Sequence, residues 1–433
     1  MNISFERIKL RPKNLIFGIL TLTMLMGTLS DDMGFPENIR YINDIFIIIL
    51  FITLFFNKER AYIVNHSDLK YISYAILIFS IINVVSVFIG LVSLPLVFWA
   101  IRNTYRFFIF YWACIVYLER EDVDIIFKWF YRIQWVNVCI VAYQYLVLGL
   151  KQDRLGGIFG HGGNAGLLIF SVLLLSYAVS KYTLKEYSLF KFLFVIISTT
   201  IISALAEIRV YFIMLAIILI INFLRTGFSY RKILVIVGAV FLLFVSLQIY
   251  AALFPYVDLS IEAFLNEGSS TGGGYNISRL NAFSEINTIF FHDSFLKNLF
   301  GYGFGNCEYS TINIFCSDFY KLYGFYNYRW FANQWIFLET GYAGVISFCS
   351  FFVISFIISF KNSKNIVVKN KSLIETGIIM TIICLISFFY NSLLKADYGY
   401  IAYFSLAIIG LVIKFQNNDK ANRIVYETEK CKI

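Results

Sequence analysis

Long apolar runs, separated by short polar stretches, follow one another along most of the chain. A helix needs about 20 mostly apolar residues to cross a bilayer, and runs of this kind predict twelve membrane-spanning helices. The predicted class is therefore an all-α, polytopic integral membrane protein. The spans lie near residues 14–29, 40–56, 70–92, 104–118, 134–150, 165–180, 189–206, 210–225, 232–254, 333–360, 373–394 and 397–413.

The run from Leu189 to Thr226 is longer than one span, with 38 residues interrupted only by Glu207-Ile208-Arg209. A single helix of that length would overshoot the bilayer, because two spans need about 40 residues. We therefore expect two helices that meet at a tight corner, with Glu207 and Arg209 at the membrane face.

The composition excludes the main soluble classes. Apolar residues make up 59% of the chain and charged residues 15%, and the mean hydropathy is +0.73. A soluble protein of this size carries roughly a quarter of its residues as charged side chains, so these few could not cover a soluble surface. The same numbers exclude disordered, collagen-like and disulfide-rich secreted chains.

Basic residues set the predicted orientation. With the amino terminus in the cytoplasm, 25 of the 36 Lys and Arg fall on the inner side, as the positive-inside rule requires. Both termini are then cytoplasmic. Contact of these residues with anionic membrane lipid explains the net charge of +9, and no nucleic-acid partner is needed. The start of the chain resembles a signal peptide without a small-residue cleavage site, so we expect an uncleaved first helix.

The large loop between the ninth and tenth spans is too long to be a simple connection. Loops longer than about 15 residues are usually functional or disordered, and the aromatic residues of this loop favour a folded one. Apolar spacing from Ile277 to Phe291 predicts a helical cap, and the glycines over 268–274 predict a flexible tip. The predicted parts are nine helices over 1–254, the large extracytoplasmic loop over 255–332, three helices over 333–415 and a cytoplasmic tail over 416–433.

Two cysteines, Cys307 and Cys316, share the large loop. Outside the cytoplasm thiols can oxidise. The alternatives are a disulfide that closes this stretch and two reduced cysteines packed in a small loop domain. The sequence contains no metal-ligand spacing, and we expect neither a metal nor a cofactor.

Two glycine-rich segments, 156–164 and 301–305, lie in the outer loops. The first lacks the Lys-Ser/Thr ending of a nucleotide-binding loop, and the second cannot belong to a βαβ unit. We interpret both as tight turns where the backbone approaches a ligand or a helix end. His161, in the first segment, is the histidine placed for proton transfer on a substrate; a turn residue or supporting residue is the alternative.

Arginine is the main candidate for ligand binding at the outer face, because its planar donor fork suits phosphate and carboxylate. Arg102 and Arg106 follow the third span, and the alternative for each is an interfacial anchor that reaches the headgroups. Arg209 interrupts an apolar run together with Glu207, and polar groups at that depth are costly and usually functional. The outer loops contribute Arg154, Arg279 and Arg329.

Taken in order, the outer-face motifs resemble the Wzy-type polysaccharide polymerases of the O-antigen polymerase/ligase superfamily. The resemblance covers about residues 100–400 and depends on the order of motifs that are each short. The motifs are DRLGGIFG over 153–160, ALAEIR over 204–209, SRLNAF over 278–283, LFGYGFG over 299–305 and NQWIFLETGYAG over 333–344.

The resemblance implies an all-helical, GT-C-like glycosyltransferase of the bacterial cytoplasmic membrane. Such enzymes work at the outer face, where they move a growing glycan from undecaprenyl diphosphate onto the non-reducing end of a new lipid-linked repeat unit. A flippase and a chain-length regulator are candidate partners. The functional arginines of the family map onto Arg209 and Arg279, which would hold the diphosphate. Related ligases often carry a His before Asn333, where this chain has Ala332, so the resemblance does not identify a general base.

The residues support the same chemistry independently. Fixed Arg donors stabilise the charge that develops on a departing lipid diphosphate without a metal, and the acceptor hydroxyl needs a base within hydrogen-bond reach. Glu339 is the candidate catalytic carboxylate, and a structural pairing with an Arg is its alternative. Asp397, Glu207 and His161 are further candidates for the base or for substrate contact. The remaining candidates for substrate binding are Arg154, Arg329, Asn333 and Gln334.

Two other functions stay open from the sequence. A ligase that transfers finished glycan to another acceptor would share the fold and the motifs. A secondary transporter would carry charged or broken helices at mid-bilayer and a repeat between its halves. This chain shows no such repeat, and its polar residues gather toward the outer side.

Overall fold

The structure is a computed structural model that describes residues 11–58, 63, 67–225, 230–253, 276–279, 281–364 and 370–430. Within these residues the chain is all-helical and contains no strand. A helix of 16 residues or more occupies each of the twelve expected intervals. They are α1 (Pro12–Asp31), α2 (Tyr41–Phe56), α4 (Leu69–Gly90), α5 (Leu94–Tyr117), α6 (Arg120–Leu146), α7 (Asn164–Thr183), α8 (Leu189–Leu205), α9 (Arg209–Arg225), α10 (Tyr230–Leu253), α15 (Ala332–Ser363), α16 (Lys371–Tyr390) and α17 (Gly399–Lys430).

Eight of these helices are long and apolar enough to cross a membrane, namely α1, α2, α4, α6, α7, α15, α16 and α17. Large apolar side chains of α2 and α4 point away from the protein, among them Ile48, Phe55 and Ile78. Contiguous exposed apolar surface of this kind is typical of a membrane-facing side. The all-helical class with membrane-compatible helices is therefore confirmed, and the twelve spans and the GT-C-like fold stay predictions.

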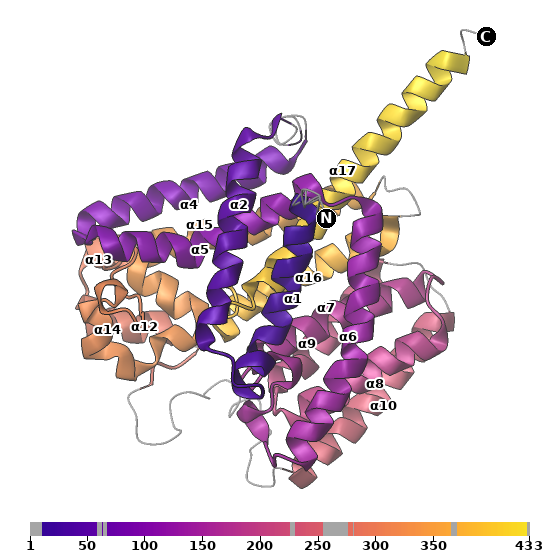
Figure 1. Cartoon of the computed structure of the whole chain (residues 1–433), viewed down its shortest axis with the longest axis horizontal. Helices are drawn as coiled ribbons and strands as arrows, with labels where there is room; N and C mark the ends of the chain where they lie inside the picture. The colour runs from indigo at the N-terminus through magenta and orange to yellow at the C-terminus, as the bar shows by residue number, and fades with distance from the viewer. Residues whose placement is uncertain are drawn as a thin grey trace, which may run out of the picture.

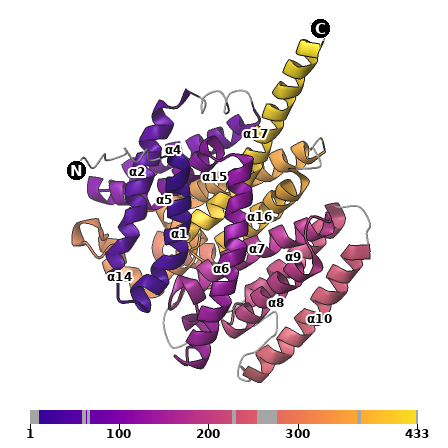
Figure 2. The same cartoon turned by 45° about the vertical axis from the view of Figure 1, so that its right-hand side comes forward.

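The centre of the bundle is formed by α7 and α17, which are buried along nearly all of their apolar stretches. A helix that is apolar on every side is stable when other helices surround it. α17 packs against α5 and α16, and α7 packs against α8 and α16. On one side of this centre α8, α9 and α10 form a group, while α4, α5 and α15 lie on the other (Figures 1 and 2).

Two helices begin earlier than their apolar runs. α5 starts at Leu94, with Pro95 in its first turn, where the expected span starts at 104. α6 starts at Arg120, with a capping box between Glu119 and Asp122, where the expected span starts at 134. A span predicted from hydropathy stops at charged residues. The helix itself can continue through charged residues when their side chains are paired inside the protein. Arg102 and Arg106 consequently lie within α5, not in a loop before it.

The corner between α8 and α9 is confirmed. α8 ends at Leu205 and α9 begins at Arg209, and Glu207 between them adopts a left-handed conformation with φ 56°. The Arg209 guanidinium donates to Glu207 Oε1 at 2.8 Å. This pairing satisfies both charges at the turn.

The described part of the large loop is helical, as expected. It contains α12 (Ala282–Ile286), the π-helical turn η4 (Asn287–Phe291), α13 (Phe295–Phe300), η5 (Asn313–Phe315), α14 (Asp318–Tyr323), η6 (Gly324–Tyr326) and η7 (Tyr328–Trp330). α12 and α13 pack on α15, and α13 also contacts α4, so this region covers one end of the bundle (Figure 1). The expected flexible tip over 268–274 lies outside the described residues.

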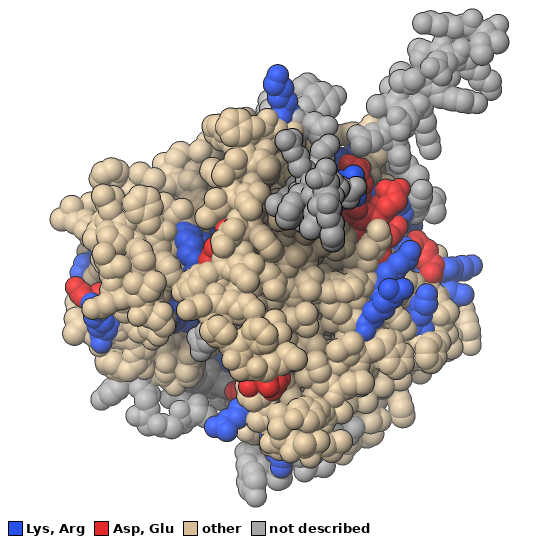
Figure 3. Space-filling model, viewed as in Figure 1, with Lys and Arg blue, Asp and Glu red and all other residues tan. Residues whose placement is uncertain are grey.

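On the face seen in Figure 3, charged side chains occur in a few small groups. Uncharged residues cover most of the remaining described surface. This distribution fits a protein whose helices face an apolar environment over much of their length. Several other charged side chains are paired within the bundle, and one group of these pairs lies around a cavity.

Candidate functional site

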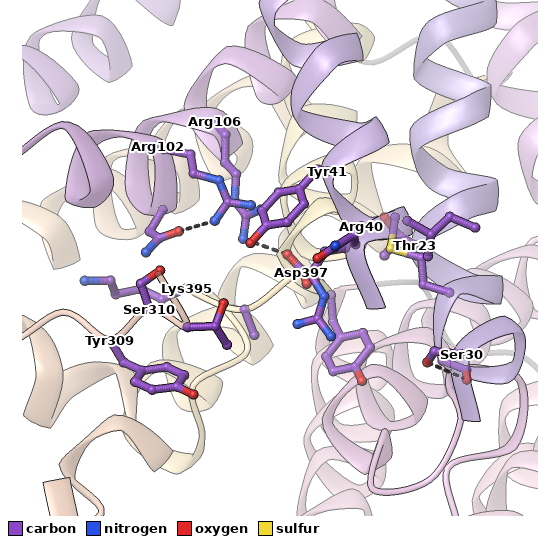
Figure 4. Close-up of a pocket in the computed structure, with 18 of the residues that line it drawn as sticks. Thr23, Ser30, Arg40, Tyr41, Arg102, Arg106, Tyr309, Ser310, Lys395 and Asp397 are labelled. Carbon is purple, nitrogen blue, oxygen red and sulfur yellow. Dashed lines mark hydrogen bonds and ion pairs between the residues drawn. The ribbon is translucent and has the colours of Figure 1, made fainter. Parts of the chain in front are cut away.

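A cavity of about 760 Å³ is enclosed by segments far apart in the sequence. It is lined by the end of α1, the turn η1 (Glu37–Arg40), the first half of α5, the loop before α7, the Tyr309 region and the connection between α16 and α17. Figure 4 shows Arg40, Arg102, Arg106, Lys395 and Asp397 around it. The distribution of basic residues predicts that these segments lie at the outer end of the bundle.

A chain of ion pairs forms one wall of the cavity. Arg102 contacts Asp44 at 2.6 Å, and Arg106 lies 3.6 Å from Asp44 and 2.8 Å from Asp397. The Arg106 side chain is only 5% exposed, and the Arg102 guanidinium lies over the Trp99 ring at 4.6 Å. The charges of both arginines are therefore paired with carboxylates of the protein, and Arg106 is buried in these pairs.

The charge of Asp397 is held by these arginines. Burial alone would raise the pKa of Asp397, but the positive charges of Arg106, Arg40 and Arg102 outweigh it and hold the pKa below its usual value. A carboxyl whose pKa is lowered on folding stabilises the folded state above its unfolded pKa. That stabilisation disappears as the pH falls through the lower folded value.

We expect Asp397→Asn to destabilise the protein by roughly 1–3 kcal/mol, since it removes the charged partner of a buried guanidinium. The unfolded pKa of Asp is about 3.9, so the difference in melting temperature from wild type should be constant between pH 5 and 8. The difference should shrink only in more acidic buffer. The melting temperatures of both proteins are measured by thermal unfolding in nanodiscs, at pH 5 to 8 and in more acidic buffer. Asp318→Asn, at an exposed pair with Lys321, is the control and should show almost no effect. A difference that disappears between pH 7 and 6 would contradict the assignment.

A second set of charges is buried behind the cavity wall. Lys395 Nζ lies 3.0 Å from Glu339 Oε2 and 3.4 Å from Glu308 Oε1, and all three side chains are 1% exposed or less. The amide of Asn103 donates to Glu308 Oε2 at 2.8 Å, and the ammonium group of Lys395 lies over the Trp335 ring at 3.9 Å. This cluster joins the large loop, α15, α5 and the connection between α16 and α17.

The alternative to a catalytic role for Glu339 was a structural pairing with an arginine. The cluster does give Glu339 a cationic partner, but this partner is Lys395. Sequence reasoning missed Lys395. Its signal was a lysine, followed two residues later by Asp397, between two closely spaced apolar runs. Asp44 was missed as well, although an acidic residue within an apolar run marks a functional or paired position.

The segment 301–305 sets the position of Glu339. Tyr302 and Gly303 donate their backbone N–H groups to the carbonyls of Leu338 and Glu339 at 2.8 and 2.9 Å. These carbonyls lie beside a kink in α15 at Gly341, whose φ is 61°. A Cβ at Gly301 would overlap the backbone of Glu339. The interpretation of this segment as a tight turn against a helix is therefore confirmed.

The loop 156–163 holds His161 at the cavity. The side chain of Gln144 pairs with both backbone groups of Gly157, at 2.8 and 3.0 Å, and a Cβ at Gly160 would overlap Gly27 of α1. His161 Nε2 lies 2.9 Å from Asp32 Oδ1, and its backbone N–H donates to Asp31 Oδ2 at 2.6 Å. The structure thus brings a histidine–carboxylate pair to the cavity wall.

Arg329 lies at the opposite side of the same cavity and also lines a second cavity of about 220 Å³. Its guanidinium is stacked on aromatic rings, 4.4 Å from Trp335, 5.0 Å from Tyr309 and 5.5 Å from Tyr320. Of the substrate-binding candidates, the structure therefore brings Arg329, His161 and Asp397 to one cavity.

Arg209 and Arg279 do not line this cavity. The Arg279 guanidinium lies over the ring of Tyr390, the last residue of α16, at 4.5 Å. α9 packs on α16, and Arg225 at the end of α9 is paired with Glu375 near the start of α16 at 2.6 Å. The two helices therefore run in opposite directions. From the length of α9 and a rise of about 1.5 Å per residue, we expect Arg209 near the end of α16 that carries Tyr390, where Arg279 lies.

Gln334 and Asn333 are buried in the first turn of α15. The Gln334 side-chain amide donates to the carbonyls of Ile277 and Ser278 at 3.4 and 3.3 Å, so it positions the segment that carries Arg279. Arg154 lies in the exposed turn η2 (Gln152–Arg154) and is not among the cavity-lining residues. Glu207 is paired with Arg209 at the α8–α9 corner.

Cys307 and Cys316 are both free in the structure and no disulfide joins them. Cys307 is buried beneath Tyr328, whose hydroxyl donates to the Cys307 carbonyl at 2.8 Å, while Cys316 is only partly buried after η5. Burial raises the pKa of the Cys307 thiol well above its usual value, which keeps it unreactive.

Among the described residues, no three His, Cys, Asp or Glu side chains are arranged to hold a metal ion. No protein-family model matches the chain, and no curated protein matches its sequence.

Proposed function

We propose that the protein is a membrane glycosyltransferase that polymerises undecaprenyl-diphosphate-linked oligosaccharide repeat units at the outer face of the bacterial cytoplasmic membrane and releases undecaprenyl diphosphate. The observation that carries the proposal is the convergence of guanidinium groups, paired carboxylates and aromatic rings at one end of an all-helical, membrane-compatible bundle. A lipid carrier brings its diphosphate and its sugars to this depth.

The diphosphate is assigned to Arg209 and Arg279. The contact of Arg279 with Tyr390 at the end of α16 and the antiparallel packing of α9 on α16 support this assignment. Arginine forks bind phosphate oxygens in pairs, and fixed donors stabilise the negative charge that develops when the diphosphate leaves. Gln334 acts as a positioning residue, because it holds the backbone beside Arg279.

The large cavity is assigned to the sugars. Its volume of about 760 Å³ lies within the usual range of ligand sites, about 300–1,000 Å³. Sugar hydroxyls both donate and accept hydrogen bonds, and the paired arginines and aspartates of the cavity wall supply both kinds of partner. Trp99, which is stacked on Phe315 at 5.0 Å, adds an aromatic ring to the lining.

The reaction joins an acceptor hydroxyl oxygen to the anomeric carbon of the donor sugar. The bond between that carbon and the diphosphate oxygen breaks, its electron pair stays on the leaving undecaprenyl diphosphate, and the hydroxyl proton passes to a base. We assign this step to His161, which lines the cavity proposed for the sugars and whose paired Asp32 would stabilise the imidazolium that forms. Glu339 is held by Lys395 and is assigned to structural support.

The proposed function is tested with the purified protein in nanodiscs and undecaprenyl-diphosphate-linked repeat units as the only substrate. A polymerase converts single units into a ladder of longer products, which gel electrophoresis resolves, and releases one undecaprenyl diphosphate per transfer. A ligase leaves the units single until another acceptor is added. Uptake of sugar into proteoliposomes without any transfer would identify a transporter and overturn the proposal.

A further inference from the structure

We propose that the large cavity selects a glycan bearing a negatively charged group, such as the carboxylate of a uronic acid, and that Arg329 binds this group. The inference rests on the proposed function and names the class of sugar that the site takes. It follows from the balance of charges around the cavity, from the surroundings of Arg329 and from the position of this residue between two cavities.

Most cations of the cavity wall have a carboxylate partner. Arg102 and Arg106 are paired with Asp44 and Asp397, and Lys395 is paired with Glu308 and Glu339. Arg40 contributes to the lowered pKa of Asp397, so its charge lies within electrostatic reach of that carboxylate. These pairs form a charge-balanced lining that suits neutral, hydroxyl-rich parts of a glycan.

Arg329 differs from these cations. Within the part of the chain that the structure describes, no carboxylate lies within ion-pair distance of its guanidinium, whereas Arg106 has two. The buried Nε of Arg329, like that of Arg106, has no hydrogen-bond partner among these residues. Stacking on Trp335, Tyr309 and Tyr320 offsets part of the lost hydration. An unsatisfied buried donor on a charged group still costs free energy. A ligand oxyanion would satisfy both the charge and the donor.

The location of Arg329 favours a ligand that extends through the site. Its side chain lines both the cavity of about 760 Å³ and the adjoining one of about 220 Å³. Tyr309 and Ser310 also line the larger cavity (Figure 4). A sugar beside Arg329 would therefore belong to a chain of several residues that continues into the larger cavity.

A single negative charge fits this place better than a diphosphate. Arg102, Arg106 and Lys395 of the larger cavity are already paired with carboxylates, so they offer little charge to the several negative charges of a diphosphate. One unneutralised guanidinium is matched by one carboxylate, and Arg329 forms the planar fork that pairs with it. The lipid diphosphate is therefore assigned elsewhere, to Arg209 and Arg279.

The test measures binding to the purified full-length protein in nanodiscs by titration calorimetry. The probes are trigalacturonic acid, its uncharged methyl ester and inorganic pyrophosphate. We expect wild type to bind the acid about tenfold to a hundredfold more tightly than the ester, as for a hydrogen-bonded ion pair. Arg329→Gln should abolish this difference, and Arg329→Lys should keep part of it. Arg231→Gln, which removes a guanidinium stacked on Tyr182 at the opposite end of the bundle, should change nothing.

Equal binding of acid and ester by wild type, no binding of the acid, or an unchanged preference in Arg329→Gln would overturn the inference. Tighter, Arg329-dependent binding of pyrophosphate would assign this residue to the carrier diphosphate and would overturn it too. Thermal unfolding of each variant shows that it is folded. Polymer formation by wild type is a separate result, so the proposed function can stand while this inference fails, and the two failures are distinguishable.

Discussion

Arg279→Ala is expected to lower the initial rate of polymer formation by about a hundredfold to a thousandfold, the usual effect of removing one fixed donor from a developing oxyanion. The guanidinium is held over Tyr390, and its segment is anchored by Gln334, so no neighbouring side chain can take its place without moving the backbone. Arg209→Ala should cause a loss of the same size. The rate is measured with lipid-linked repeat units and the purified variants in nanodiscs.

Three further variants make this prediction sharp. Arg279→Lys keeps the charge without the planar fork and should retain a small part of the activity. The double variant Arg209→Ala/Arg279→Ala should lose little more than either single variant, because residues that act as a unit are not additive. Arg231→Gln, also a guanidinium stacked on a tyrosine, should polymerise normally. Normal polymer from Arg209→Ala or Arg279→Ala would remove these arginines from the site.

Lys395→Met is expected to destabilise the protein by about 3–5 kcal/mol, because it leaves the buried carboxylates of Glu308 and Glu339 without their shared cation. It also removes the contact of the ammonium group with Trp335. Since this cluster joins the large loop to α15 and α5, the loop should separate from the bundle at a lower temperature. Thermal unfolding, followed by tryptophan fluorescence and by limited proteolysis of the loop, measures both effects.

The reason for the destabilisation can be tested by neutralising the carboxylates. Lys395→Met/Glu308→Gln/Glu339→Gln should recover most of the lost stability, because removing all members of a buried charge cluster costs much less than removing one. Lys321→Met, at the exposed pair with Asp318, is the matched control and should change stability by less than about 0.5 kcal/mol. If the triple variant were as unstable as Lys395→Met, the loss would come from packing and not from unpaired charge.

Local features of the chain were predictable where a short segment determines its own conformation. Glu207-Ile208-Arg209 interrupts an apolar run too long for one helix, and the chain turns there. The glycines at 301–305 and 156–163 predicted tight turns, and their backbones approach α15 and α1 closely. In each case a few adjacent residues supply the whole reason for the conformation.

Helix starts and the site were predictable only in part, because they depend on partners elsewhere in the chain. Arg106 looked like an anchor at the membrane surface, yet it is buried between Asp44 and Asp397, about 60 and 290 positions away by the sequence numbering. Lys395 gave almost no signal on its own, although it unites two carboxylates from other segments.

The sequence by itself determined that the protein is all-helical, where its long apolar helices lie and where the chain turns, because apolar length and glycine content act locally. Only the tertiary structure decided which charges neutralise each other and which arginines share a cavity. Ion pairing acts over a few ångströms between side chains that hundreds of residues can separate, so it is decided by packing and not by order along the chain.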